Sequence, residues 1–293
     1  MPPAVIRSLL FVPGHDERKI EKALAGEADA VILDLEDAVA EESKARAREV
    51  TAAWLEPARA SGRAVFVRIN GFDTPHALAD LVTAVAGAPF GVMLPKCCGL
   101  RDVERLSHHL DALEVREGLT QGSTRILPVA TETAAATLDL PSFAAAPAPR
   151  LWGLLWGGED LSADLGAARN RDAGGAYTLP YQFARAQCLM AAAAAGAVAV
   201  DAVSVDFRDL EALDRETREA LADGFTAKAA IHPAQIPVIN AALTPDAEQI
   251  AWAEAVLAAL DGKGAGRLEG RMVDQPHRRS AIRILARAGR AIS

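Results

Sequence analysis

Polar and charged side chains follow short apolar runs along most of the chain, and the acids among them outnumber the bases. These residues are Glu36, Asp37, Arg68, Asn70, Lys96, Glu132, Glu159 and Asp160. If the ends of the runs meet in space, the carboxylates raise one another's pKa unless a cation neutralises them. A ligand set made only of oxygens favours Mg²⁺, with Mn²⁺ as the alternative, over zinc. The pattern therefore indicates a divalent-metal site.

The stretch LLWGGEDLSADLG at 154–166 changes most abruptly from apolar to acidic. Its apolar part ends in Gly157-Gly158, and Glu159 and Asp160 follow directly. Glycine has no Cβ, so this turn lets other groups approach its backbone closely. We expect Gly158 to border a ligand, with Asp160 beside it.

Each of these residues also has a purely structural alternative. An acid that follows a strand is often only the N-cap of the next helix, which applies to Asp160, Glu132, Glu36 and Asp37. Arg68 lies inside the apolar stretch VFVRIN and needs a carboxylate or phosphate partner. That partner could be a substrate or, in a structural ion pair, one of the acids.

The elements that must position these residues alternate along the chain. Eight β-rich apolar runs occupy 7–12, 29–35, 64–69, 90–95, 125–130, 151–156, 197–205 and 226–232. Amphipathic segments typical of helices lie between them, at 43–55, 77–86, 100–117 and 210–222. The runs are apolar on both faces, as parallel strands are. The alternation predicts an α/β fold, a (β/α)₈ TIM barrel over residues 1–240, with its active site at the carboxyl ends of the strands.

The pattern changes after residue 240. We expect a helix from about 245 to 260, a Gly-rich turn, a short segment RLEGRMVD, and a last helix from about 276 to 291. Residues 241–293 are thus predicted to be a C-terminal helical extension. Within the barrel, 168–178 is the longest predicted loop, and loops of this length are often functional.

Composition limits the partners and the compartment. The net charge of −8 argues against binding to nucleic acid, because such binding depends on clustered Lys and Arg. The three cysteines form neither a CxxC pair nor an even disulfide framework. The N-terminal residues lack a secretory signal, and no uncharged run is long enough to span a bilayer. A cytoplasmic protein without membrane contact is expected.

Seven stretches in order resemble one known family. RSLLFVPG, ADAVILDLEDAV, VFVRING, LPK, VATET, LLWGGEDLSADLG and AKAAIHPAQI are similar to blocks of the citrate lyase β-subunit-like proteins, also grouped with the HpcH/HpaI aldolases. The resemblance runs from about Arg7 to Asn240. It implies a TIM barrel that cleaves or forms carbon–carbon bonds in hydroxyacyl thioesters with Mg²⁺.

The resemblance also implies roles for individual residues. Glu132 and Asp160 match metal ligands, with Glu132 also next to the substrate. Arg68 matches the arginine that holds the carboxylate or oxo group of the acid fragment. Glu36 and Asp37 match acids near the water shell of the metal.

The C-terminal segment GRMVDQPHRRSAIRIL resembles the end of malyl-CoA, methylmalyl-CoA and citramalyl-CoA lyases. This resemblance implies that Asp274 acts as an acid/base at the site of a neighbouring subunit, in a homotrimer or a multiple of it. The structural alternative is that Asp274 is the N-cap of the last helix, with Pro276 in its first turn.

The working hypothesis is a Claisen-type lyase that interconverts a short 3-hydroxyacyl-CoA bearing a free carboxylate with an acyl-CoA and a 2-oxo acid. Lys96 and the arginines of 168–171 could contact CoA phosphates or be ordinary surface charges. The alternatives are a citryl-thioester lyase β subunit working with an acyl carrier protein, a malyl-CoA thioesterase, and a noncatalytic acyl-CoA-binding barrel.

Overall fold

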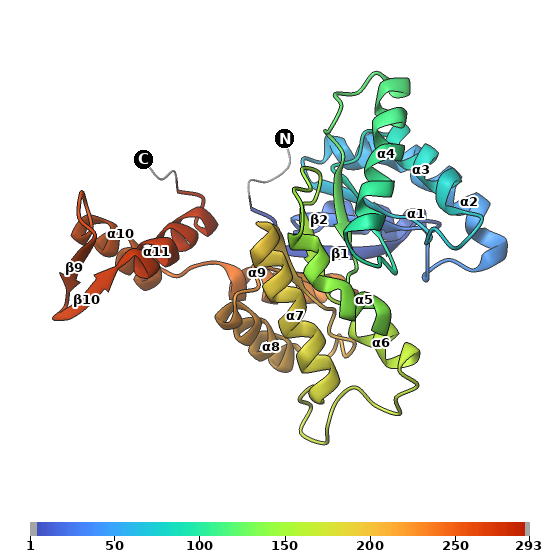
Figure 1. Ribbon diagram of the computed structural model, residues 1–293. Helices are drawn as coiled ribbons and strands as arrows, with labels where there is room; N and C mark the ends of the chain where they lie inside the picture. Colours follow the sequence, from blue (N-terminus) through green and yellow to red (C-terminus); the bar gives the residue numbers. More distant parts are fainter. Residues whose placement is uncertain (1–4, 291–293) are drawn as a thin grey trace. The chain divides into compact units, whose positions relative to one another are not determined.

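The computed structural model describes residues 5–290, and the chain forms two compact units that divide between Ile239 and Asn240. The first unit is a barrel of parallel strands with helices along its outside (Figure 1). None of the helices in the described range combines the length and the apolar character needed to cross a membrane.

Within the described residues, eight strands pair in the order β5-β4-β3-β2-β1-β8-β7-β6. They are β1 (Ser8–Pro13), β2 (Ala30–Asp34), β3 (Ala64–Arg68), β4 (Gly91–Leu94), β5 (Arg125–Pro128), β6 (Gly153–Leu155), β7 (Val198–Asp201) and β8 (Ala227–Ala230). Parallel bridges from Ile126 to Leu151 and from Val129 to Leu155 join β5 to β6 and close the barrel. The predicted TIM barrel is confirmed, and each of its strands lies within a predicted apolar run except β1, which extends one residue beyond its run, to Pro13.

The helices follow the strands in the alternating order that the sequence indicates. The α-helices of this part of the chain are α1 (Glu17–Ala25), α2 (Lys44–Ala60), α3 (Ala77–Ala86), α4 (Leu100–Glu117), α5 (Ala134–Asp139), α6 (Gly158–Asp164), α7 (Leu179–Ala195), α8 (Leu210–Asp223) and α9 (Ile236–Leu243). Short 3₁₀ helices are η1 (Glu41–Ser43), η2 (Leu140–Ala144) and η3 (Pro233–Gln235). The predicted bounds of α3 and α4 agree with the structure.

Apolar packing inside the barrel explains why the strands are hydrophobic on both faces. β2 and β3 are buried along their whole length. Phe66 of β3 contacts the rings of Phe90 and Trp152, with both centroid distances at 5.2 Å. Such a core fixes the strand register, and the register decides which polar residues meet where the strands end.

The second unit contains α10 (Ala247–Ala259), β9 (Ala265–Leu268), β10 (Arg271–Asp274) and α11 (Gln275–Arg287). Its core includes Val256, Val273 and Leu285. The segment RLEGRMVD, predicted only as a short connection, forms part of an antiparallel hairpin. Glu269 and Gly270 both have φ in the left-handed region, 49° and 80°, as a two-residue hairpin turn requires. Position 291, where we expected the last helix to end, lies outside the described residues.

Candidate active site

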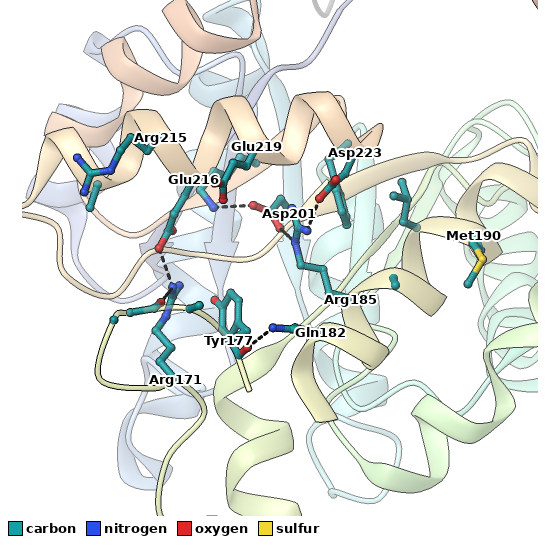
Figure 2. Close-up of a pocket in the computed structure, with 18 residues that line it drawn as sticks. Arg171, Tyr177, Gln182, Arg185, Met190, Asp201, Arg215, Glu216, Glu219 and Asp223 are labelled. Atoms are coloured by element: carbon teal, nitrogen blue, oxygen red, sulfur yellow. Dashed lines mark hydrogen bonds and ion pairs between the residues drawn. The ribbon is translucent and has the colours of Figure 1, made fainter. Parts of the chain in front are cut away.

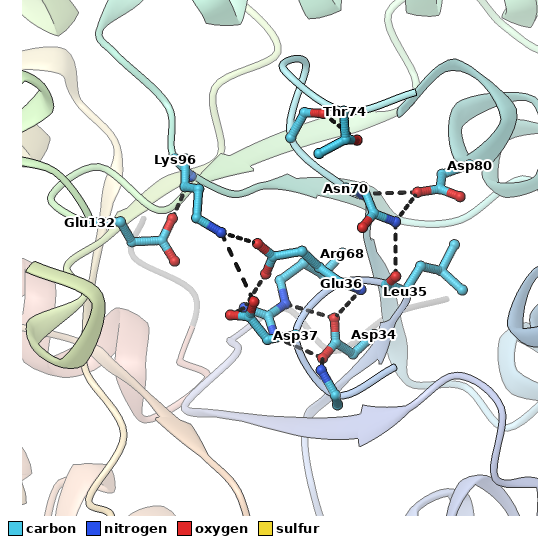
Figure 3. Close-up of polar contacts among 12 residues, drawn as sticks. Asp34, Leu35, Glu36, Asp37, Arg68, Asn70, Thr74, Asp80, Lys96 and Glu132 are labelled. Atoms are coloured by element: carbon cyan, nitrogen blue, oxygen red, sulfur yellow. Dashed lines mark hydrogen bonds and ion pairs between the residues drawn. The ribbon is translucent and has the colours of Figure 1, made fainter. Parts of the chain in front are cut away.

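A buried ion pair between two neighbouring strands anchors the candidate site. The parallel register places Asp34, the last residue of β2, opposite Arg68, the last residue of β3. The Arg68 guanidinium donates from Nε to Oδ1 and from Nη2 to Oδ2 of Asp34, both at 2.7 Å (Figure 3). It also lies 4.9 Å from the centre of the Phe11 ring. Burial lowers the pKa of Arg68, but the hydrogen bonds to Asp34 and the charges of Asp34, Glu36 and Asp37 together raise it more, so the net shift is upward and the guanidinium stays charged.

Asp34 also shapes the turn that follows β2. Its two carboxylate oxygens accept hydrogen bonds from the backbone N–H groups of Glu36, at 2.9 Å, and Ala38, at 3.1 Å. The next helical element is η1, which begins at Glu41. Glu36 and Asp37 are therefore not helix caps, and the capping alternative for both residues is wrong.

Glu36 and Asp37 extend the ion pair into a network. Nη1 of Arg68 lies 2.9 Å from Oε2 of Glu36 and 3.5 Å from Oδ2 of Asp37. The ammonium of Lys96 contacts the other oxygen of Glu36 and lies 3.9 Å from Asp37. Burial raises the pKa of Glu36 above its usual value, against the lowering effect of the two cations. Two cations thus share two acids on the edge of the barrel.

Lys96 contributes its backbone as well as its side chain. Its φ is 50°, in the left-handed region that non-glycine residues rarely adopt. Its backbone N–H donates to Oε2 of Glu132 (Figure 3). Backbone strain of this kind is often found at functional sites, and here it accompanies a direct contact with a candidate metal ligand.

Glu132 is a buried carboxylate with little compensation for its charge. It is 3 % exposed. Burial raises the pKa of Glu132 to about 8, the nearby charges of Asp160 and Glu36 add to the rise, and the Lys96 N–H and Arg68 oppose it. The cap of α5 is the neighbouring Thr133, whose side chain accepts from Ala136 N. The capping alternative for Glu132 is therefore wrong.

The Gly157-Gly158 turn brings Asp160 towards Glu132. Gly157 is the N-cap of α6, so Asp160 sits in the first turn of that helix and is not its cap. A Cβ on Gly157 would lie 3.1 Å from Cγ of Glu132, and one on Gly158 would lie 3.0 Å from the Trp156 ring. The absence of side chains at both positions lets the turn approach the acid and the indole.

Several of these groups line a cavity of about 370 Å³ where the strands end. Arg68, Glu132, Gly158 and Asp160 line one part of it. The rest of its wall is largely apolar and includes Phe11, Val129, Leu155, Trp156, Tyr177, Val203 and Ile231. Asp37 also faces a neighbouring hollow of about 500 Å³, which Glu36 and Lys96 line. Sequence analysis had named Arg68, Glu132, Gly158 and Asp160, but not Asp34, which also lines the cavity.

Glu132 and Asp160 have the chemistry of a cation site. Among residues 5–290, no group of three or more His, Cys, Asp or Glu side chains is arranged to hold a metal ion. The two carboxylates nevertheless face one cavity, and the charge of one raises the pKa of the other. A divalent cation between them would offset this repulsion, with substrate or water oxygens as further ligands.

Sequence analysis missed several residues that line the cavity. Asp34 was counted only as part of the apolar run DAVILDL, although it ends β2 in register with Arg68 and pairs with it. Phe11 and Tyr177 were not singled out, because an aromatic residue in a run or a loop carries no chemical pattern of its own.

Two further residues predicted from the sequence, Arg171 and Asp274, each contact a neighbouring side chain. Arg171, proposed from the 168–171 loop as a phosphate contact, forms an ion pair with Glu216 at 2.8 Å. In the second unit, Asp274 is the N-cap of α11, with Pro276 in the first turn, as the structural alternative predicted. Its carboxylate lies 2.7 Å from Nδ1 of His277.

Comparison with known proteins assigns the family. Residues 7–233 match the HpcH/HpaI aldolase/citrate lyase family. The chain is 40% identical over 286 residues to a citrate lyase subunit beta-like protein of Mycobacterium tuberculosis, covering 97% of this chain and 96% of the relative. It is 36% identical to the mitochondrial citramalyl-CoA lyase of Rattus norvegicus, covering 96% and 86%. A (3S)-malyl-CoA thioesterase of Cereibacter sphaeroides is 35% identical, covering 96% and 94%.

Solved structures agree with the sequence comparison. The crystal structure of the protein CitE from Mycobacterium tuberculosis in complex with magnesium, acetoacetate and coenzyme A superposes with a TM-score of 0.78 at 38% identity, covering 98% of this chain and 99% of that one. The protein belongs to the HpcH/HpaI aldolase/citrate lyase family of TIM-barrel enzymes. The family and the lyase class predicted from the sequence are confirmed.

Proposed function

We propose that this protein is a Mg²⁺-dependent carbon–carbon lyase that interconverts a short 3-hydroxyacyl-CoA carrying a free carboxylate with an acyl-CoA and a 2-oxo acid. The observation that carries the proposal is one cavity in which an anchored guanidinium, Arg68, faces two carboxylates, Glu132 and Asp160, whose charges repel. The names of the relatives support it, since they include a citramalyl-CoA lyase and a CitE bound to magnesium, acetoacetate and coenzyme A.

Glu132 and Asp160 would hold the metal. When bound, Mg²⁺ supplies a Lewis acid that lowers the pKa of the substrate hydroxyl and favours the developing charge on its oxygen. With a pKa of about 8, Glu132 holds its proton at neutral pH unless a cation lies nearby. Ionisation of this residue is therefore tied to metal binding.

Arg68 would orient the acid fragment. Asp34 already holds two of its nitrogens, so the guanidinium is fixed before the substrate arrives. A fixed cation that pairs with the substrate carboxylate favours the transition state, because little reorganisation is needed. Glu36 and Asp37 would set the position of Arg68 and of water near the metal, and Gly158 would leave room for the substrate.

In the cleavage direction, the substrate hydroxyl gives its proton to water, and its oxygen forms the carbonyl of the 2-oxo acid. The carbon–carbon bond breaks, and its electron pair passes to the α-carbon of the acyl-CoA. A proton must then reach that carbon. We assign this transfer to Asp274, supplied by a neighbouring copy in a homotrimer or a multiple of it. Lys96 would contact the phosphates of the thioester.

An assay of the purified protein tests the proposal. The substrates are malyl-CoA, β-methylmalyl-CoA and citramalyl-CoA, each with Mg²⁺ and with EDTA, and free thiol and 2-oxo acid are followed separately. We expect 2-oxo acid without free thiol, only with Mg²⁺. Asp160→Asn should abolish this turnover and keep the fold, whereas near-full activity would exclude Asp160 as a metal ligand.

A second candidate is a malyl-CoA thioesterase, which the 35% identical (3S)-malyl-CoA thioesterase favours. It would give free thiol and malate in the same assay, with no 2-oxo acid from the added thioester. If neither free thiol nor 2-oxo acid forms and an acyl carrier protein copurifies, the protein is instead a citryl-thioester lyase subunit.

A further inference from the structure

A second, larger cavity lies next to the candidate active site. Its volume is about 660 Å³, and its wall is formed by α7, α8 and the 171–177 segment (Figure 2). Charged side chains from both helices line it, among them Arg185 and Glu216. One residue, Tyr177, belongs to the lining of this outer cavity and also to that of the 370 Å³ cavity. The ring therefore stands between the two spaces.

Aromatic contacts hold the Tyr177 ring on both sides. On the side of the active site, the ring meets Trp156 edge-on, with centroids 4.9 Å apart and planes at 78°. On the other side, the guanidinium of Arg171 lies 3.8 Å from the ring centre. The backbone carbonyl of Tyr177 accepts a hydrogen bond from Nε2 of Gln182 at 2.5 Å (Figure 2).

The groups that hold Tyr177 are themselves anchored. Trp156 is fully buried, and its indole N–H donates to Asp201 at 2.7 Å. Lys228 donates to the other oxygen of Asp201 at 2.8 Å. Arg171 is tied to Glu216 of α8. A wall supported in this way does not yield easily to a larger ligand.

Tyr177 stands against the turn that carries a candidate metal ligand. A Cβ on Gly158 would lie 3.7 Å from Cε1 of Tyr177, so the ring faces the start of the turn that leads to Asp160. In the proposed function, the 2-oxo acid binds between Arg68, Glu132 and Asp160. Tyr177 lines the same cavity as these three residues.

We infer that Tyr177 determines specificity by limiting the size of the 2-oxo acid substituent, and that its ring separates the substrate cavity from the outer cavity. The inference rests on the proposed function, because it assigns the oxo-acid fragment to this side of the cavity. Removal of the ring joins the two spaces and creates room for a longer hydrocarbon chain.

The test compares CoA thioesters whose oxo-acid part derives from glyoxylate, pyruvate or 2-oxobutanoate. In Tyr177→Ala, the ratio of kcat/KM for the 2-oxobutanoate thioester to that for the pyruvate thioester should rise about tenfold, the lower end of the discrimination a pocket achieves for one methylene. Tyr177→Phe retains the ring and should keep the parent ratio. Leu189→Ala enlarges the outer cavity alone and should also keep it.

Binding separates this inference from the proposed function. Calorimetric titration with pyruvate and with 2-oxobutanoate, in the presence of Mg²⁺, needs no turnover, so it decides the role of Tyr177 even if every lyase assay is silent. Tyr177→Leu serves if the alanine variant does not fold. A folded Tyr177 variant without the ring that keeps the parent ratios overturns the inference, as does a Leu189→Ala variant that shifts them.

Discussion

The two ends of the barrel each bury a glutamate, and their environments are opposite. Glu132 lies where β5 and β6 end, and burial raises its pKa to about 8. Glu114 of α4 lies near the starts of the same two strands, and its pKa is lowered to about 2. Both side chains are almost inaccessible to solvent. Burial alone therefore does not explain the difference.

Hydrogen-bond partners account for it. Glu114 accepts from Nη1 and Nη2 of Arg150 at 2.9 and 2.6 Å, and from the N–H groups of Gly122 and Thr124, both at 2.7 Å. Burial by itself would raise the pKa of Glu114, but these donors together lower it by more than burial raises it. Glu132 accepts from the Lys96 N–H and has acids as neighbours. A buried carboxylate whose hydrogen-bond acceptors are all used stabilises the fold. A buried carboxylate with few donors that faces a cavity is available to a ligand.

The largest contrast is expected in turnover. Glu132→Gln should lower kcat at least about 10³-fold, because a metal supplies several kcal/mol of transition-state stabilisation. Its circular dichroism spectrum should match that of the parent. Steady-state kinetics with Mg²⁺ measure the loss, and near-full activity in this variant would remove Glu132 from the metal site.

Glu114→Gln should show the reverse behaviour. Loss of the charge leaves Arg150 with the partly exposed Asp111 as its remaining carboxylate partner, and breaking a buried ion pair costs about 3 kcal/mol of stability. Urea denaturation measures this cost, while kcat at a temperature where the variant is folded should be unchanged. A comparable loss of kcat would mean that the opposite end of the barrel also shapes the site.

Acid and base titration should separate the two glutamates in metal-free protein. Because the pKa of Glu132 is raised to about 8 from an ordinary 4.5, the folded state binds the extra proton between these values. Stability should then fall as pH rises from about 4.5 to about 8, by at most about 1.4 kcal/mol per pH unit. Glu114 has the opposite sign, because its contribution is present above pH 4.5 and lost as pH falls towards 2.

Melting curves in EDTA for the parent and for the two glutamine variants measure both effects. The fall in stability between about pH 4.5 and about 8 should be weaker in Glu132→Gln and unchanged in Glu114→Gln. If stability falls equally with pH over this interval in the parent and in Glu132→Gln, this residue does not carry the extra proton.

Asp274 sharpens the comparison, because its side chain is 35 % exposed and paired with His277. If it transfers a proton during turnover, Asp274→Asn should lower kcat about 10²-fold or more, the usual contribution of general acid–base catalysis, with little change in Mg²⁺ affinity. An unchanged rate with a small loss of stability would assign it to helix capping alone.

The fold could be predicted from the sequence because each barrel strand is a short apolar run followed by an amphipathic segment. The hairpin of the second unit was missed, since Met272 and its neighbours are mostly exposed and give no apolar alternation. Its signal was the Glu269-Gly270 turn, which specifies a reversal of the chain without requiring a buried strand.

The charged part of the site could be predicted because parallel strands present their last residues at one edge. The partner of Arg68 could not be predicted. Asp34 lies opposite it because of the relative register of β2 and β3, which the sequence does not reveal. Tyr177 and the outer cavity depend on the path of a loop and on two helix surfaces, which no local pattern records.

The junction between β5 and β6 gives the site a mechanical property. These strands are joined by isolated bridges, while β2 pairs with β1 and with β3 over five residues each. Glu132 follows one strand of this junction and Asp160 follows the other. An ion held by both would act as a cross-link between the two strands. Loading with metal should therefore slow amide exchange at Ala130, whose N–H donates to the Leu155 carbonyl across the junction.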